Sequence, residues 1–417
     1  MSAGSLQTGD GASAEIRARH YQTGGWVRLT VNGSSIASVE PIDGPMEPTA
    51  GDDWIAPAFW DIQLNGRWGV SFSDPSVTPG QVAEIVRAQA ALGTARLCPT
   101  FITAPFASLK AGVSAVAAAC EADPNVAARV VGLHLEGPYI SGVDGYRGAH
   151  PLAAVRDPDW DEFQSLQEAS GGRVVLMTLA PERPGSIPFI RKAVASGVTI
   201  ALGHTAADGD TLRAAADAGA TLSTHLGNGI ASPLPRHPNP ILEQAALDAL
   251  SASLIADGHH LDLSTLRVLA RAKTPGRVVL VSDASPLAGL PPGTYGAWAV
   301  DPSGKIVVAG TPYLAGSNQG LEVGLNVYME ATGLTVAEAL ATVTSHPARL
   351  LGRPEPTLDA GQPANLVRFR LHTSPDRPGR PPRFELRATC VQGSWTVANE
   401  SPAPETIRMP VPTGGDV

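Results

Sequence analysis

The segment RVVLMTLAPERPGSIPFIRKAVASGVTIALGH (173–204) decides the fold. It begins with an apolar, β-branched run (173–181), continues with a helical pattern (186–196) and ends with a second apolar run (197–204). Two apolar strands that flank one helix are typical of a β–α–β unit, in which the strands are parallel and the helix crosses over. The segment therefore predicts a parallel sheet covered by helices.

The same alternation continues in both directions along the chain, with further helical patterns at 79–92, 108–121, 210–218 and 264–273. The strand candidates are AFWDIQL (58–64), ARLCPTF (95–101), RVVGLHLEG (129–137), RVVLMTLAP (173–181), GVTIALGH (197–204), ATLSTHL (220–226), SASLIADG (251–258) and RVVLVSDA (277–284). Eight such strands, most of them followed by a helix, predict a closed (β/α)8 barrel of the TIM type. An open, doubly wound sheet is the alternative that the pattern leaves.

Both ends of the chain are rich in short strand patterns. They are AEIRAR (14–19), WVRLTV (26–31) and SIASVE (35–40) at one end, and NLVRFRL (365–371), ELRATCVQG (385–393) and SWTVA (394–398) at the other. The pair Asn32–Gly33 between two such runs is a hairpin signal. We expect residues 1–56 and 359–400 to pair into one small β-sandwich domain beside a barrel of residues 57–358. Residues 1–10 and 401–417 are expected to be disordered.

Composition limits the partners. The 417 residues carry a formal net charge of −9, which argues against nucleic acid and anionic membrane surfaces as partners. A small anionic substrate is compatible with this charge, because one or two cationic side chains suffice to bind it. The three cysteines show no C-x-x-C spacing, and the N-terminus has no basic, apolar leader pattern. We expect a cytoplasmic protein without disulfides.

Polar residues stand at the ends of five predicted strands. They are Glu136, His204, His225, His260 and Asp283. The carboxyl ends of barrel strands and the loops after them form one mouth, so we expect these side chains to face a common pocket.

The types of these residues fit a metal site. Glu136, His204 and His225 form a His2Glu set, the ligand pattern of a catalytic zinc that keeps one position for water. Asp283 is a further ligand or a base for the metal-bound water, and we favour the base because three ligands suffice. Each residue also has a structural alternative: a hydrogen-bonded core histidine, a glutamate that ends a strand, or an aspartate that caps a helix. Glu136, His204, His225 and Asp283 end four different predicted strands, and this coincidence favours a metal site that holds one divalent ion, Zn²⁺.

Several motifs, in order from about residue 57 to 320, resemble the N-acetylglucosamine-6-phosphate deacetylase family of the amidohydrolase superfamily. They are DIQLNG (61–66), GLHLEGP (132–138), RGAHP (147–151), TLAPE (178–182), GHT (203–205), STHLGN (223–228), IADGHH (255–260), SDA (282–284) and LAGS (314–317). The resemblance implies a homodimer that hydrolyses the N-acetyl group of N-acetylglucosamine 6-phosphate to glucosamine 6-phosphate and acetate.

The resemblance also implies roles for single residues. Glu136, His204 and His225 match the metal ligands, Asp283 matches the catalytic acid and base, and His150 matches the histidine that contacts the acetamide carbonyl. Arg236 and His260 match the phosphate binders, with Arg236 reaching across the dimer interface. The full set of implied substrate-binding residues is Ala149, His150, Asn228, Gly229, Arg236, His260, Leu314, Ala315 and Gly316. Without the resemblance, Arg236 reads as a surface charge in a Pro-rich loop. His259 has no assigned role.

Some positions depart from the common patterns. Gln63 and Asn65 stand where many amidohydrolases have His-x-His for a second metal, so we interpret them as vestigial second-metal positions. Thr178 replaces a bridging lysine, which again predicts one ion. Gly227 and Gly229 replace bulkier residues and predict a reshaped pocket. Two alternatives therefore stay open: an amidohydrolase for a different N-acyl amine or amide, and a non-catalytic barrel that binds sugar phosphates.

Overall fold

The computed structural model describes residues 13–373 and 379–398. The predicted disordered tails, residues 1–10 and 401–417, lie outside the described residues.

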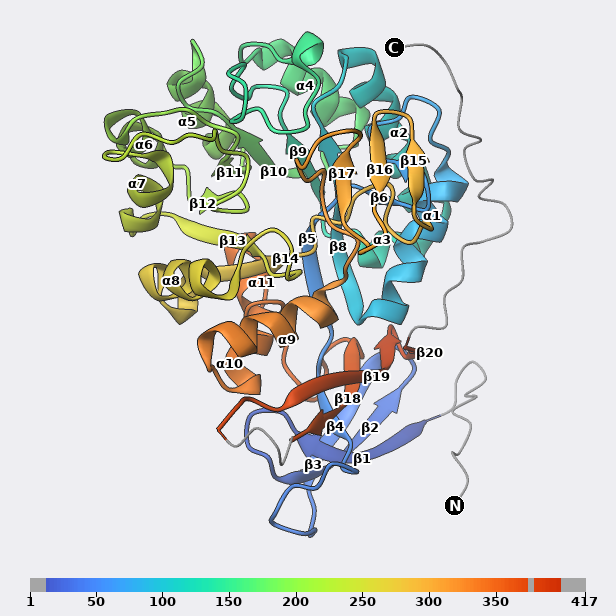
Figure 1. Ribbon diagram of the computed structural model, residues 1–417. Coiled ribbons are helices and arrows are strands. Elements are labelled where there is room, and N and C mark those ends of the chain that lie inside the picture. The colour runs from blue at the N-terminus through green and yellow to red at the C-terminus, as the bar shows by residue number, and fades with distance from the viewer. Residues whose placement is uncertain (1–12, 374–378, 399–417) are drawn as a thin grey trace.

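Eight parallel strands form a closed barrel, as the alternation predicted (Figure 1). They are β5 (Phe59–Leu64), β8 (Thr94–Ile102), β9 (Leu133–Glu136), β10 (Val174–Leu179), β11 (Thr199–Leu202), β12 (Leu222–Ser223), β13 (Ser251–Ile255) and β14 (Val278–Val281). Their order in the sheet is the order in the chain, and a parallel bridge between Leu64 and Ala284 joins the last strand to the first. The open-sheet alternative is therefore wrong.

Helices cover the outside of the barrel. They are α1 (Pro79–Ala88), α2 (Phe106–Ala122), α3 (Pro124–Arg129), α4 (Trp160–Ala169), α5 (Ser186–Ala195), α6 (Gly209–Asp217), α7 (Pro240–Ala246), α8 (Leu263–Lys273), α9 (Leu321–Thr332), α10 (Val336–Ala341) and α11 (Ser345–Leu350), with short 3₁₀ turns at Gln89–Leu92, Leu152–Ala154 and Pro275–Arg277. Within the described part of the chain, no helix is both long and apolar enough to cross a bilayer.

Side-chain caps explain where several helices begin. The side chains of Thr78, Asp159, Asp208 and Asp262 accept hydrogen bonds from the first free backbone N–H groups of α1, α4, α6 and α8. The sequence did not predict α3, α4, α7, α9, α10 and α11. Pro158 precedes the cap of α4, and Pro238 and Pro240 flank Asn239, the cap of α7. Proline favours loops as well as first helical turns, so it obscures such cap signals.

The interior of the barrel is packed with apolar side chains rather than open. The inward cluster consists of Ile62, Cys98, Leu176, Ala201, Leu222, Ile255, Val279 and Val281. This filling is the usual arrangement in a barrel of this size, and it leaves only the ends of the strands for a site.

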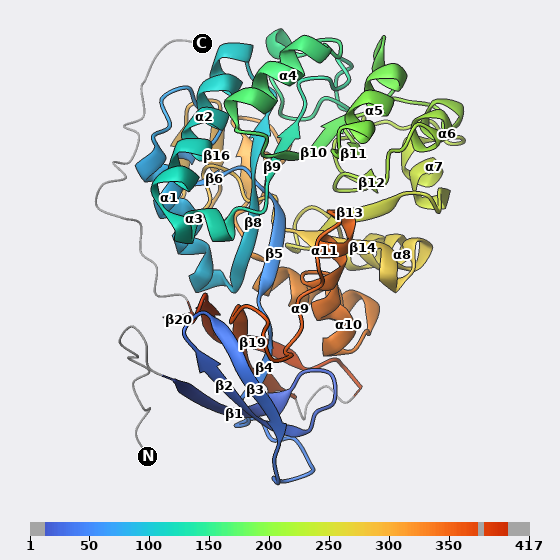
Figure 2. The ribbon, with the colours of Figure 1, turned by 180° about the vertical axis from the view of Figure 1, so that it is seen from behind.

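Both chain ends build one small β domain, as predicted (Figures 1 and 2). Its strands are β1 (Ala14–His20), β2 (Trp26–Asn32), β3 (Ser35–Pro41), β4 (Trp54–Pro57), β18 (Leu366–His372), β19 (Arg383–Val391) and β20 (Ser394–Val397). They join in the order β20-β19-β18-β4-β1-β2-β3, so the sandwich is one hydrogen-bonded sheet folded over a shared core. The two ends of this sheet meet closely, because a Cβ atom at Gly393 would lie 2.0 Å from the carbonyl oxygen of Gly33. The residue limits of the two domains stay a prediction.

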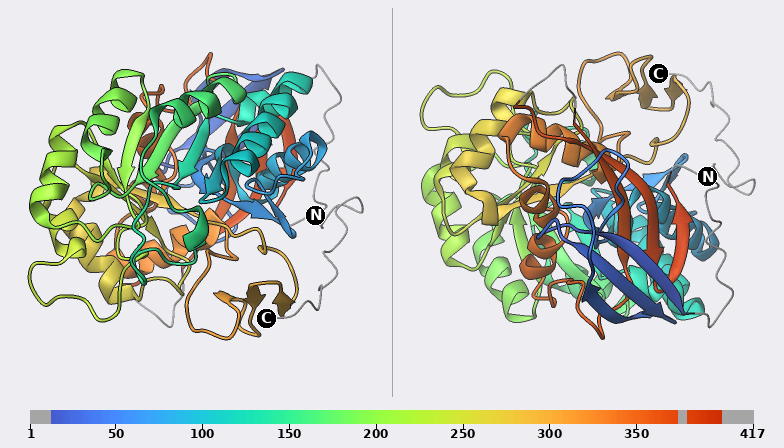
Figure 3. Two further views of the ribbon diagram at one scale, coloured as in Figure 1. Left: turned by 90° about the horizontal axis from the view of Figure 1, so that it is seen from above. Right: turned by 90° about the horizontal axis from the view of Figure 1, so that it is seen from below.

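Two small elements were not predicted. The hairpin β6 (Gly66–Arg67) and β7 (Val70–Ser71) follows the first barrel strand, and the sheet of β15 (Gly293–Tyr295), β16 (Trp298–Val300) and β17 (Ile306–Val308) follows the last. The three-stranded sheet stands to one side of the barrel (Figure 3). A local apolar cluster that includes Leu287, Val300 and Ala315 holds it together, and Trp298 and Ala149 pack against this cluster.

Replacing Arg19 by methionine should destabilise the small domain. Its side chain is 1% exposed, and its guanidinium donates to Asp52 (2.6 Å) and to several backbone carbonyls. The change should lower the free energy of unfolding by about 3 kcal/mol, because it leaves a carboxylate and these carbonyls unpaired. Arg28→Met, which removes a guanidinium from exposed ion pairs, should change it by less than about 0.5 kcal/mol. Urea unfolding of both variants tests this, and equal losses would contradict it.

Candidate metal centre and catalytic pocket

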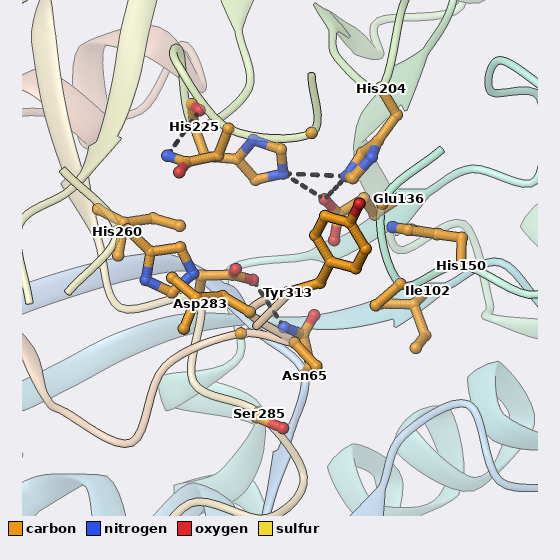
Figure 4. Close-up of a pocket in the computed structure, with 18 of the residues that line it drawn as sticks. Asn65, Ile102, Glu136, His150, His204, His225, His260, Asp283, Ser285 and Tyr313 are labelled. Atoms are coloured by element: carbon orange, nitrogen blue, oxygen red, sulfur yellow. Dashed lines mark hydrogen bonds and ion pairs between the residues drawn. The ribbon is translucent and has the colours of Figure 1, made fainter. Parts of the chain in front are cut away.

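Three predicted ligands meet at the ends of three barrel strands. Glu136 is the last residue of β9, while His204 and His225 follow β11 and β12. Oε1 of Glu136 lies 2.9 Å from Nε2 of His225 and 3.3 Å from Nε2 of His204, and the two nitrogens are 3.1 Å apart (Figure 4). All three residues are buried, and their donor atoms lie within 4.8 Å of one another.

The backbone at these strand ends is unusual. His204, His225 and Asp283 take positive φ angles of 49°, 30° and 48°. Non-glycine residues pay about 1–3 kcal/mol for such conformations, which persist only where surrounding bonds enforce them. The backbone N–H of His225 donates to Ser253 (2.7 Å) and that of Asp283 to the carbonyl of Gln63 (3.0 Å). The barrel therefore holds these side chains in place at the cost of local strain.

The hydrogen bonds of His204 fit a bound cation. Its Nδ1 lies 3.0 Å from the carbonyl oxygen of Tyr146, and a carbonyl can only accept. The neutral ring therefore carries its proton on Nδ1, and the Nε2 lone pair points at Glu136 and at Nε2 of His225. Histidines that bind metal are commonly oriented in this way by a carbonyl on the other nitrogen. Two imidazoles and a carboxylate are also a donor set that zinc accepts.

The pKa values of Glu136 and Asp283 are shifted in opposite directions. Burial alone would raise the pKa of Glu136, but its close contacts with the His204 and His225 rings hold that pKa well below the usual value. The pKa of Asp283 is raised, first by burial and then by the nearby charge of Glu136. A carboxylate that stays ionised beside one that accepts a proton more readily is the pattern expected of a ligand and a base.

The residues interpreted as vestigial second-metal positions contact Asp283 instead. Its Oδ1 accepts hydrogen bonds from Nδ2 of Asn65 (2.7 Å) and Nε2 of Gln63 (3.1 Å). Gln63, Asn65 and Asp283 are all buried. Two neutral amides thus occupy the space beside Asp283.

His150 lies next to the candidate metal-ligand cluster of Glu136, His204 and His225. Its ring centroid is 4.2 Å from that of His204. Burial, and then the neighbouring His204, lower the pKa of His150 to about 3, so its ring is neutral. The backbone N–H of Thr103 points at its Nδ1 (3.4 Å), which marks Nδ1 as an acceptor and leaves the proton on Nε2. His150 can therefore donate one hydrogen bond into the pocket that it lines.

One cavity of about 310 Å³ is lined by Asn65, Glu136, His150, His204, His225 and Asp283. Of the residues predicted to bind substrate, the cavity is lined by Ala149, His150, Asn228, Gly229, His260, Leu314, Ala315 and Gly316. Arg236 is the exception: it is exposed in the loop before α7 and does not line the cavity of its own chain.

Gly227 and Gly229 line the cavity, and both lie close to neighbouring side chains. A Cβ atom at Gly229 would lie 2.7 Å from Nδ1 of His204, and one at Gly227 would meet Leu261 at 3.1 Å. Both also have positive φ angles, 59° and 97°. The absence of side chains at these positions allows close packing on a metal ligand and on the core.

Sequence reasoning missed several residues of the site, among them Thr103, Asp257, Trp298 and Tyr313. Thr103 orients His150, and the buried Asp257 accepts the Nδ1–H of His260 at 2.8 Å. Tyr313 and Trp298 line the cavity, and Tyr313 is 62% exposed. The Asp-Gly pair three residues before His260 was an available turn signal for Asp257. The others come from segments whose approach to the mouth depends on tertiary structure.

Comparison with known proteins agrees with this geometry. The amidohydrolase family profile matches residues 54–396. The N-acetylglucosamine-6-phosphate deacetylase of Homo sapiens is 40% identical over 332 residues, which cover 75% of this chain and 78% of that protein. The chain belongs to the amidohydrolase family and, within it, to the N-acetylglucosamine-6-phosphate deacetylase family. The predicted resemblance is confirmed.

Other similar proteins support the same placement. The N-acetylgalactosamine-6-phosphate deacetylase of Escherichia coli O157:H7 is 33% identical over 344 residues, which cover 81% of this chain and 89% of that protein. The crystal structure of the Mycobacterium smegmatis N-acetyl-D-glucosamine-6-phosphate deacetylase has a TM-score of 0.80 and 30% identity, and covers 92% of this chain and 100% of that chain. A variant of that enzyme, solved in complex with N-acetyl-D-glucosamine-6-phosphate, has a TM-score of 0.79.

The three-residue centre should hold a single divalent ion per chain. His204→Ala should lose most of the bound metal, because it removes one of three donors. His259→Ala is the matched control, since His259 does not line the cavity, and it should retain the metal. Elemental analysis after dialysis measures the difference. If His204→Ala kept the metal content of the parent protein, the site would lie elsewhere.

Proposed function

We propose that the protein is a deacetylase with a single bound zinc ion that converts N-acetylglucosamine 6-phosphate and water to glucosamine 6-phosphate and acetate. The observation that carries the proposal is the position of Asp283, which two amides hold in the cavity that Glu136, His204 and His225 also line. Membership of the deacetylase family supports the same reaction.

Glu136, His204 and His225 would hold the ion. When bound, a divalent ion there supplies a Lewis acid that polarises the acyl oxygen and acidifies a water. Asp283 takes the proton of the attacking water and returns it to the leaving nitrogen. Acid–base help of this kind contributes roughly 10²–10⁴-fold to the rate. Its carboxylate is placed for both steps, because two amides hold Oδ1 and no described residue donates a hydrogen bond to Oδ2.

His150 stabilises the acyl oxygen as negative charge develops on it. The neutral ring donates from Nε2, and Thr103 fixes this tautomer and the ring orientation. A fixed donor in a buried site needs no reorganisation when the charge appears.

The phosphate group is bound from two sides. His260 lies in the cavity and is oriented by Asp257, whereas Arg236 is exposed and outside it. We therefore propose a homodimer in which Arg236 of each chain completes the cavity of the other. A guanidinium fork suits a phosphate dianion.

We further propose a cytoplasmic location. The cysteines Cys98, Cys120 and Cys390 are free and buried, which suits a reducing compartment.

The sugar is tested by amine release from a panel of substrates. The panel contains N-acetylglucosamine 6-phosphate, its galacto and manno epimers, and the unphosphorylated sugars. The galacto epimer is included because one relative is an N-acetylgalactosamine-6-phosphate deacetylase. Preference for another N-acyl compound would indicate an amidohydrolase with a different substrate. Absence of amine release from every compound would support a non-catalytic protein that binds sugar phosphates.

Asp283→Asn should keep the metal but reduce kcat by at least about 100-fold, because the amide cannot take a proton from water. Asp210→Asn changes an exposed carboxylate on α6 in the same way and should leave kcat unchanged. Metal content and steady-state kinetics measure both variants. A near-normal rate for Asp283→Asn would assign the base to another group.

Arg236→Ala should raise KM for the phosphorylated sugar far more than for its unphosphorylated analogue. Mixing the inactive Asp283→Asn protein with Arg236→Ala protein under subunit exchange should restore activity. The hybrid contains one cavity with both an intact Asp283 and an Arg236 from its neighbour. Restoration would be absent if Arg236 served its own chain's cavity or none.

A further inference from the structure

The side chain of Asn65 has one hydrogen-bonding atom that the protein does not use. Its Nδ2 donates to Asp283, but its Oδ1 is buried and has no partner among the described residues. Asn65 is 5% exposed and lines the cavity. Buried acceptors are nearly always paired in native proteins, so an unpaired one beside a catalytic group points to a donor that arrives with the substrate.

The orientation of this amide is determined by its neighbours. Oδ1 of Asp283 is an acceptor, so the side of Asn65 that faces it must be the NH₂ group. The opposite orientation would place two oxygens against each other at 2.7 Å. The backbone holds the residue as well, since the N–H of Asn65 donates to the carbonyl of Ala284 (2.9 Å) across the barrel closure. Oδ1 of Asn65 therefore faces away from Asp283.

The two oxygens of Asp283 are also distinguished. Both Asn65 and Gln63 donate to Oδ1, while Oδ2 receives no hydrogen bond from the residues that the structure describes. The amides thus fix the carboxylate by one oxygen and leave the other for proton transfer.

We infer that Asn65 is a positioning residue that binds the scissile nitrogen: its Oδ1 accepts the amide N–H of the substrate while its Nδ2 fixes Asp283. The inference rests on the proposed deacetylase function. It places the nitrogen beside the carboxylate that must protonate it. Asp283 first takes a proton from water as the new C–O bond forms. That proton passes to the nitrogen as the C–N bond breaks, and acetate and the amine leave.

Gln63 provides a matched control for this role. Like Asn65 it donates to Asp283, but it is 1% exposed and does not line the cavity. Replacing Gln63 loosens the base without touching the substrate nitrogen. Replacing Asn65 loosens the base and also removes the contact with the substrate nitrogen.

The first experiment compares an amide with an ester. The metal-loaded parent protein, Gln63→Met, Asn65→Ala and Asn65→Leu are assayed with N-acetylglucosamine 6-phosphate and with 2-O-acetylglucose 6-phosphate, which has no N–H. Gln63→Met should lower kcat by the same factor for both. Each Asn65 variant should lower kcat for the amide about tenfold more than for the ester, with smaller effects on KM. Equal losses on amide and ester would overturn the inference.

The second experiment measures binding without turnover. Calorimetry gives the affinities of the metal-loaded proteins for glucosamine 6-phosphate and for glucose 6-phosphate, which lacks the amine. Asn65→Ala should lose about tenfold of the preference for the amine, and Gln63→Met should keep most of it. An unchanged preference in Asn65→Ala would overturn the inference.

The two proposals fail in different ways. Absence of acetate release by the parent protein would remove the deacetylase function, even if the preference for the amine depended on Asn65. Normal release by the parent protein, combined with equal amide and ester losses in the variants, would remove only the role of Asn65.

Discussion

The closure of the barrel between β5 and β14 is the constraint on which the site depends. The bridge from Leu64 to Ala284 and the bond from the N–H of Asp283 to the carbonyl of Gln63 pin these two strand ends together. The seam brings the amides of Gln63 and Asn65 against Asp283. It also fixes the last strand end relative to β9, β11 and β12, which carry the metal-ligand cluster.

Within this frame, the surroundings of each acidic residue give it its role. Glu136 lies against two imidazoles, which lower its pKa, whereas Asp283 is held by neutral amides and its pKa is raised by burial and by the charge of Glu136. These different surroundings fit the roles proposed for the two carboxylates, a metal ligand for Glu136 and a proton carrier for Asp283. His150, neutral because it is buried beside other imidazoles, adds a donor without adding charge.

The residues behind the site define what its side chains can do. The carbonyl of Tyr146 keeps the proton of His204 on Nδ1, and Thr103 keeps that of His150 on Nε2. Asp257 orients the ring of His260. None of these partners is recognisable as functional by residue type alone. Their effect is to choose tautomers and directions, which decides whether an imidazole offers a lone pair or a proton.

The sequence by itself determined the eight barrel strands, the β-rich ends and the strand ends that carry Glu136, His204, His225 and Asp283. This was possible because apolar alternation and strand-end position are local properties. Only the tertiary structure decided that Gln63 and Asn65 hold Asp283, that Gly229 packs on His204, and that Arg236 lies outside the cavity of its own chain. Gln63 and Asp283 are 220 residues apart, and no local pattern encodes a hydrogen bond that exists only when the sheet closes.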